Sequence, residues 1–150
     1  MNRSNERHIR EIALAIIVLI IGICFFGRYH IFGGNLDWLD QHSVIPDYFR
    51  RLFYATGNIF PQFAPNIGGG QNIYNFAYYG LFNPIILISY ALPFVRMDNY
   101  IMIVSLIGIG IGAVLLYRWL LHNEFSKNLS FVLACMYIFA VPIIYHSYIH

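Results

Sequence analysis

Residues 12–27 decide the fold and read IALAIIVLIIGICFFG, without a single Asp, Glu, Lys or Arg. The charged segment NRSNERHIRE precedes this run and Arg28 follows it. With its flanks to about position 32, the run is long enough to cross the roughly 30 Å hydrocarbon core of a bilayer. A cleaved signal peptide also has a charged start, but no small-x-small cleavage site follows here. We therefore expect an uncleaved transmembrane helix over about 11–32.

The composition of the whole chain indicates the same environment. Apolar residues make up 59% of the 150 residues and charged residues only 11%, whereas soluble domains carry roughly a quarter charged residues. The 12 Tyr and 13 Phe residues are an enrichment expected where side chains meet lipid headgroups. The net charge of +2, without a Lys/Arg run, argues against a nucleic-acid partner. The lipid bilayer is the partner that this composition predicts.

Three further apolar stretches are expected spans, at about 74–95, 99–121 and 129–149. The last two are long enough by themselves. Asn83-Pro84 lies near the middle of the first stretch, where the proline would free a carbonyl group and could break the helix. Pro142 interrupts the last stretch. The expected fold class is all-α membrane, with polytopic transmembrane helices and an external loop over about 33–73.

The orientation follows from the charges before the first span. Three arginines outnumber two glutamates between positions 1 and 11, so the positive-inside rule predicts a cytoplasmic N-terminus in a multi-pass cell-membrane protein. Four full spans would place 122–128 outside, whereas a re-entrant 74–95 would place that loop inside. Arg118 and Lys127 suit either placement, and the sequence leaves this open. Because no polar tail follows the last stretch, we expect residues 1–150 to be the N-terminal part of a larger protein.

Small residues in the apolar stretches favour packing over chemistry. Gly108 and Gly112 form a GxxxG pair, which lets another helix approach closely. Cys24 and Cys135 are far apart and have no Cys or His at ligand spacing, so neither a disulfide framework nor a zinc site is expected.

The expected external loop carries the candidate chemistry. Asp37, Asp40 and Gln41 would share one face of a local helix, followed by His42. A carboxylate at a cavity mouth can act as a general base towards a hydroxyl group, and a neighbouring acid can raise its pKa. Ordinary solvated loop acids are the alternative reading of the same residues, and a structural role is the alternative for His42.

A short amphipathic helix is predicted over 44–56, after Ser43 as a cap and before Thr56-Gly57-Asn58. Its apolar face comprises Ile45, Phe49, Leu52 and Phe53, as suits a helix lying at a membrane surface. Arg50 follows Asp47 by three positions and should contact it. Arg50 and Arg51 are candidates for holding a lipid phosphate, or alternatively anchors at the membrane surface.

The segment 60–72 is rich in proline, glycine and amide side chains. Near a membrane such an irregular backbone needs protein or a water-lined cavity around it. The glycine triplet 68–70 lacks the GK[ST] ending of a phosphate-binding P-loop.

Several of these pieces, taken in order, resemble the start of the YfhO family. The pattern comprises Asp37-x-x-x-Gln41-His42, Pro46-Asp47-Tyr48-Phe49-Arg50, Gly68-Gly69-Gly70-Gln71-Asn72 and Tyr78-Tyr79-Gly80-Leu81-x-Asn83-Pro84. That family consists of bacterial multi-spanning proteins with a GT-C glycosyltransferase fold. The resemblance runs from about Asn5 to the end of the chain and covers only the N-terminal part of a typical member.

The resemblance implies an enzyme that transfers a sugar from a polyprenyl-phosphate-linked donor to a teichoic acid-type acceptor outside the cytoplasmic membrane. It implies that Asp37 is the catalytic base, because an acid of the first external loop has that role in GT-C enzymes. Candidate substrate-binding residues are Asp40, Gln41, His42, Arg50, Gln71 and Asn72. His42 departs from the Tyr often found after the Gln. No metal site or cofactor is expected from these residues, and the sequence does not decide whether a divalent metal takes part.

Two readings from other classes compete with the glycosyltransferase. A transporter or lipid flippase is favoured by the helix break expected at Asn83-Pro84. A non-catalytic scaffold that packs against another membrane enzyme is consistent with the GxxxG pair.

Overall fold

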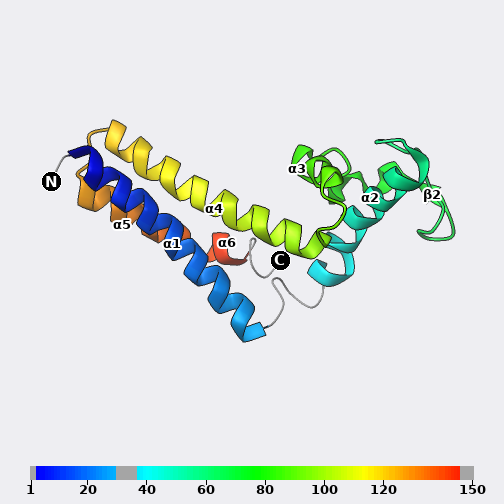
Figure 1. Cartoon of the computed structure of the whole chain (residues 1–150), viewed down its shortest axis with the longest axis horizontal. Coiled ribbons are helices and arrows are strands. Elements are labelled where there is room, and N and C mark those ends of the chain that lie inside the picture. The colour runs from blue at the N-terminus through cyan, green and yellow to red at the C-terminus, as the bar shows by residue number, and fades with distance from the viewer. Residues whose placement is uncertain (1–2, 30–36, 146–150) are drawn as a thin grey trace. The chain divides into compact units, whose positions relative to one another are not determined.

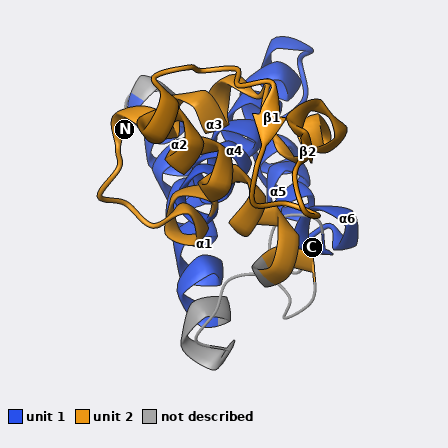
Figure 2. Ribbon diagram, turned by 90° about the vertical axis from the view of Figure 1, so that its right-hand side faces the viewer, with its two compact units in different colours: residues 1–34, 102–150 blue, residues 35–101 orange. Residues whose placement is uncertain are grey.

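The computed structural model describes residues 3–29 and 37–145, and these are mostly helical (Figure 1). The helices are α1 (Arg3–Tyr29), α2 (Val44–Thr56), α3 (Pro84–Ile88), α4 (Met97–His122), α5 (Lys127–Ile138) and α6 (Val141–Ile144). Short helical turns η1 (Trp38–His42), η2 (Ile73–Tyr79) and η3 (Ser89–Ala91) join them, with a two-stranded antiparallel sheet of β1 (Phe63–Ala64) and β2 (Gln71–Asn72). The chain forms two compact units, residues 1–34 with 102–150, and residues 35–101 (Figure 2).

In the first unit, α1, α4 and α5 pack as neighbours with alternating direction. Gly22 of α1 lies so close to Leu106 of α4 that a Cβ atom there would be 2.8 Å from Leu106 Cδ2. A second contact joins Glu11, eleven positions before Gly22, to Arg118, twelve positions after Leu106. Because the contacts run backwards along α1 and forwards along α4, the two helices are antiparallel. A Cβ at Gly112 would meet the Tyr137 hydroxyl at 2.5 Å. The close approach expected at the GxxxG pair is therefore made at Gly112, against α5.

One end of this unit is polar and gathers three helix ends. The Arg118 guanidinium donates to both Glu11 carboxylate oxygens at 2.8 and 2.9 Å, and Lys127 Nζ lies 2.5 Å from Glu6 Oε2. Arg10 donates to the Lys127 carbonyl at 2.7 Å. The start of α1, the end of α4 and the start of α5 thus lie at the same end. The alternative that places 122–128 on the side of the N-terminus agrees with these contacts, and the four-span scheme does not.

Within the described residues, α4 is the one helix long and apolar enough to cross a membrane by its length and composition, with a mean hydropathy of 2.3 over an 18-residue stretch. The apolar stretch expected over 129–149 forms α5 and then, after a break at Phe139–Ala140, the short α6 with Pro142 in its first turn. Positions 146–149 of that expected span lie outside the described residues, as do 30–32 of the first.

The expected helix over 74–95 is wrong as a continuous element. The region forms η2, α3 and η3 instead, because Gly80 takes φ +110° and Asn83 is extended. The Asn83 side chain accepts a hydrogen bond from Ile85 N at 2.9 Å, and Pro84 occupies the first turn of α3. An asparagine cap followed by proline starts a new helix, since proline cannot continue the preceding one.

Candidate functional site

Helix α2 begins and ends at the residues predicted from the sequence, Val44 and Thr56. Phe49 is fully buried, and Ile45, Leu52 and Phe53 are half-buried, which confirms the predicted apolar face. Gly57 ends the helix with φ +71°, a conformation that favours glycine. The predicted side-chain cap by Ser43 is wrong: its hydroxyl donates instead to the Trp38 carbonyl at 3.0 Å.

Arg50 is a buried charge that joins α2 to the segment before α4. Its Nη1 donates to the carbonyl oxygens of Leu92 at 3.2 Å and Val95 at 2.9 Å. Its Nη2 donates to Asp47 Oδ1 at 2.7 Å, which confirms the predicted contact. Only 6% of the side chain is exposed. The guanidinium fork meets three acceptors with donors of fixed planar geometry, whereas a lysine would offer a compact ammonium group on a flexible stem.

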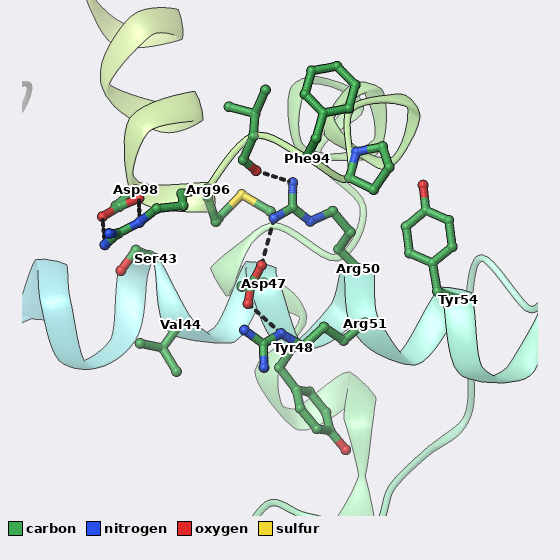
Figure 3. Close-up of a pocket in the computed structure, with 13 residues that line it drawn as sticks. Ser43, Val44, Asp47, Tyr48, Arg50, Arg51, Tyr54, Phe94, Arg96 and Asp98 are labelled. Carbon is green, nitrogen blue, oxygen red and sulfur yellow. Dashed lines mark hydrogen bonds and ion pairs between the residues drawn. The ribbon is translucent and has the colours of Figure 1, made fainter.

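A cavity of about 690 Å³ opens beside this contact (Figure 3). It is lined by Ser43, Val44, Asp47, Tyr48, Arg50, Arg51, Tyr54, Pro93, Phe94, Val95, Arg96, Met97 and Asp98. Three arginines and two aspartates leave one net positive charge. Apart from Ser43, aromatic and apolar side chains supply the remaining walls, so the cavity combines charge with apolar surface.

Two of the cavity arginines are open to solvent. Asp47 lies between Arg50 and Arg51 in Figure 3 and binds Arg51 Nε at 2.7 Å through its second oxygen. Arg96 pairs with Asp98 at 2.6 Å. The side chains of Arg51 and Arg96 are 80% and 79% exposed, so an anion can reach both. Exposed pairs of this kind are worth about 0–1 kcal/mol and exchange partners easily.

A second cluster contains the predicted base. Asp37 precedes the π-helical turn η1, in which Ser43 N donates to the Trp38 carbonyl at 3.0 Å and Trp38 is buried. The Tyr79 hydroxyl donates to Gln41 Oε1, and the Tyr79 ring lies 5.6 Å from that of His42. Single turns of π-helix are frequent at functional sites.

Tyr79 is held in its neutral form within this cluster. The hydrogen-bonding interaction with Tyr78, then burial, then the charges of Tyr78 and Asp37 raise the pKa of Tyr79 to about 12. The centres of the Tyr78 and Tyr79 rings are 4.0 Å apart. The Tyr79 hydroxyl therefore stays a hydrogen-bond donor to Gln41 at neutral pH.

The remaining predicted residues, Asp40, Gln71 and Asn72, lie in the same unit. Asp40 is exposed on η1. Asn72 caps η2 by accepting from Tyr74 N at 2.9 Å, and Gln71 pairs with Ala64 in the sheet. Between the two strands, the three glycines take φ of +58°, +82° and +99°, which explains the triplet as a turn.

The structure thus brings Gln41 and His42 together with Tyr79, with Asp37 directly before the same turn, and places Arg50 in the cavity beside α2. Sequence reasoning missed Arg96 and Asp98 as cavity residues, although the charged triplet Arg96-Met97-Asp98 between apolar stretches was a visible signal. In the described part of the chain, no three His, Cys, Asp or Glu side chains are grouped to hold a metal ion.

Comparisons of the chain with protein-family models, curated proteins and solved structures gave no match.

Proposed function

We propose that this chain is the N-terminal membrane part of an inverting GT-C glycosyltransferase that resembles the YfhO family. The donor is a polyprenyl-phosphate-linked sugar, and the acceptor is an extracytoplasmic envelope polymer such as lipoteichoic acid. One observation carries the proposal: Gln41 and His42, in the turn that follows Asp37, meet Tyr79, so two separate pieces of the family-like pattern form one cluster.

In this mechanism the Asp37 carboxylate takes the proton of the acceptor hydroxyl as its oxygen attacks C1 of the donor sugar. The bond between C1 and the phosphate oxygen breaks on the opposite face, and the polyprenyl phosphate leaves with the electron pair. Asp37 is exposed, as a base that meets a large acceptor must be. A positioned base contributes about 10²–10⁴-fold to the rate. The Tyr79 hydroxyl orients Gln41 beside it.

The cavity beside α2 is the proposed site of the donor phosphate. Arg51 and Arg96 are exposed there and can exchange Asp47 and Asp98 for phosphate oxygens. Arg50, the arginine predicted from the sequence, contributes by fixing α2 to the carbonyls of Leu92 and Val95, with its charge at the cavity wall. The apolar lining suits a phosphate that arrives on a lipid.

The membrane placement is also part of the proposal. The polar end of the first unit, with Arg7, Arg10, Arg118 and Lys127, lies on the cytoplasmic side. Helix α1 leads outward, residues 37–96 lie outside and α4 returns. The chain is then multi-pass without a span over 74–95. This arrangement places Asp37 and the α2 cavity on the side where lipid-linked sugars are used.

A transporter or lipid flippase is the second candidate, favoured by the helix break at Asn83 and Pro84. The two functions differ in their products. Purified full-length protein in liposomes, given a polyprenyl-phosphate sugar and teichoic acid, should transfer the sugar covalently. Movement of the donor across the bilayer without covalent product would refute the glycosyltransferase and support the transporter.

A further inference from the structure

A second, smaller cavity lies in the first unit, where the start of α1 meets the end of α4. It has a volume of about 330 Å³ and is lined by Arg7, Arg118, Leu121 and His122. Two of its four lining residues are arginines, and the His122 ring can donate a further hydrogen bond. The lining therefore offers donors for an anion.

A single carboxylate holds the two arginines in place. Glu11 binds Arg118 through both oxygens at 2.8 and 2.9 Å, and Arg7 Nε lies 3.6 Å from Glu11 Oε1. The Glu11 side chain is only 10% exposed, whereas Arg7 and Arg118 are 49% and 52% exposed. One negative and two positive charges leave the group with one net positive charge facing solvent.

Both arginines keep donors for a ligand. Arg118 uses Nε and Nη2 on Glu11, and within the described residues its Nη1 has no protein partner. The two amino groups of Arg7 likewise have no hydrogen-bond or ion-pair partner in the described part of the chain, where Arg7 pairs with Glu11 through Nε. Phosphate oxygens are the acceptors that planar guanidinium groups bind best.

The position of this cavity along α4 favours a lipid over a free anion as its ligand. Residues 99–117 carry no charge, and a helix over them is about 28 Å long, so Arg118 lies at headgroup depth if α4 spans the membrane. Trp119, next to it, is exposed, as in the aromatic belts of membrane proteins. Leu115 on α4 and Ile12 on α1 are exposed on the apolar side and can accompany acyl chains.

We propose that this cavity, at the junction of α1 and α4, binds the phosphate of an anionic phospholipid headgroup. The proposal rests on the proposed membrane placement of α4 and is independent of sugar transfer. Basic pockets between helices on the cytoplasmic side are suited to anionic headgroups. Bound there, the lipid holds the ends of α1 and α4 together through Arg7 and Arg118, while Glu11 keeps the two arginines oriented.

Native mass spectrometry of the full-length protein in detergent tests the site, with phosphatidylglycerol and phosphatidylethanolamine added as probes. The wild type should bind one phosphatidylglycerol in preference to phosphatidylethanolamine. Arg7→Gln leaves the Glu11–Arg118 pair intact and should weaken phosphatidylglycerol binding about fivefold, the value of one basic group near a lipid surface. Arg10→Gln is the matched control, because Arg10 lies on the same helix but contacts Lys127 and Asn128. It should change binding less than twofold.

Three results would overturn the proposal. These are no preference for the anionic lipid, equal losses in the two variants, or displacement of the lipid by inorganic phosphate at a concentration comparable to that of the lipid. The thermal stability of each variant is measured in parallel, and equal Tm values show that a loss of binding is not unfolding. Asp37→Asn should bind phosphatidylglycerol as the wild type does, which separates this test from that of the glycosyltransferase.

Discussion

Replacing Arg50 by Gln should loosen α2 from the segment that precedes α4. The substitution removes a buried cation and its three hydrogen bonds, to Asp47, Leu92 and Val95. Breaking a buried pair costs about 3–5 kcal/mol. The low end applies here, because Asp47 is 20% exposed and keeps Arg51 as a partner. We therefore expect the free energy of opening α2 locally to fall by about 3 kcal/mol.

Arg51→Gln is the matched control, one position along the same helix. Its side chain is 80% exposed, and exposed pairs contribute little, so the expected loss is below about 1 kcal/mol. Arg50→Lys keeps the charge but cannot reach all three acceptors in one plane. It should fall between the other two variants.

Hydrogen exchange read by mass spectrometry on the purified full-length protein measures the effect where it occurs. A loss of about 3 kcal/mol corresponds to roughly 150-fold faster exchange of the α2 amides that open with this contact. The amides of α5, in the other unit, should be unchanged. Equal exchange in the Arg50→Gln and Arg51→Gln proteins would refute the structural role assigned to Arg50.

Three further predictions concern the helix packing, the topology and the tyrosine cluster. Gly112→Val should lower the free energy of unfolding by about 1–3 kcal/mol, since a Cβ there meets Tyr137. Gly108→Val is the control, because a Cβ at Gly108 has open space among the described residues. Thermal unfolding in detergent compares the two variants, and equal Tm values would contradict the α4–α5 contact. A cysteine that replaces Asn58 should react with an impermeant thiol reagent on whole cells. A cysteine that replaces Asn123 should react with it only after the cells are permeabilised. Labelling of both on whole cells would contradict the topology. Tyr79→Phe should lower the free energy of unfolding by about 1 kcal/mol through the lost hydrogen bond. Because the pKa of Tyr79 is raised to about 12, this difference in stability is fully present below pH 10 and is lost as the pH rises through 12. Unfolding of both proteins at pH 8 and pH 11 measures the difference in stability, and a constant difference would show that the pKa of Tyr79 is not raised.

Local rules predicted α2 well, because each of its signals lies within or beside the helix. The spacing of Ile45, Phe49, Leu52 and Phe53, and Gly57 at its end, required no knowledge of the rest of the chain. The same holds for the contact of Asp47 with Arg50. Asn83-Pro84 also signalled the break that the structure contains, although the stretch around it was apolar enough to suggest a span.

Contacts between distant segments were beyond such rules. Nothing near Glu11 indicates that Arg118 is its partner, and that pair brings the end of α4 to the start of α1. The burial of Arg50 depends on carbonyl groups more than forty positions away. The meeting of Gln41 with Tyr79 was likewise hidden, because a side-chain hydrogen bond between two loops leaves no periodic pattern. The catalytic role of Asp37 stays a prediction.

The central claim is that Asp37 is the base of a glycosyltransferase, and Asp37→Asn in the full-length protein tests it most directly. Asparagine keeps the size of the side chain and removes the base, and Asp40→Asn is the matched control, three positions away and also exposed. With both variants expressed at wild-type levels, glycosylated teichoic acid is quantified in cells that lack the native gene copy. The account predicts a loss of about 10²–10⁴-fold in transfer for Asp37→Asn and near-normal transfer for Asp40→Asn. Normal glycosylation with asparagine at position 37 would contradict it.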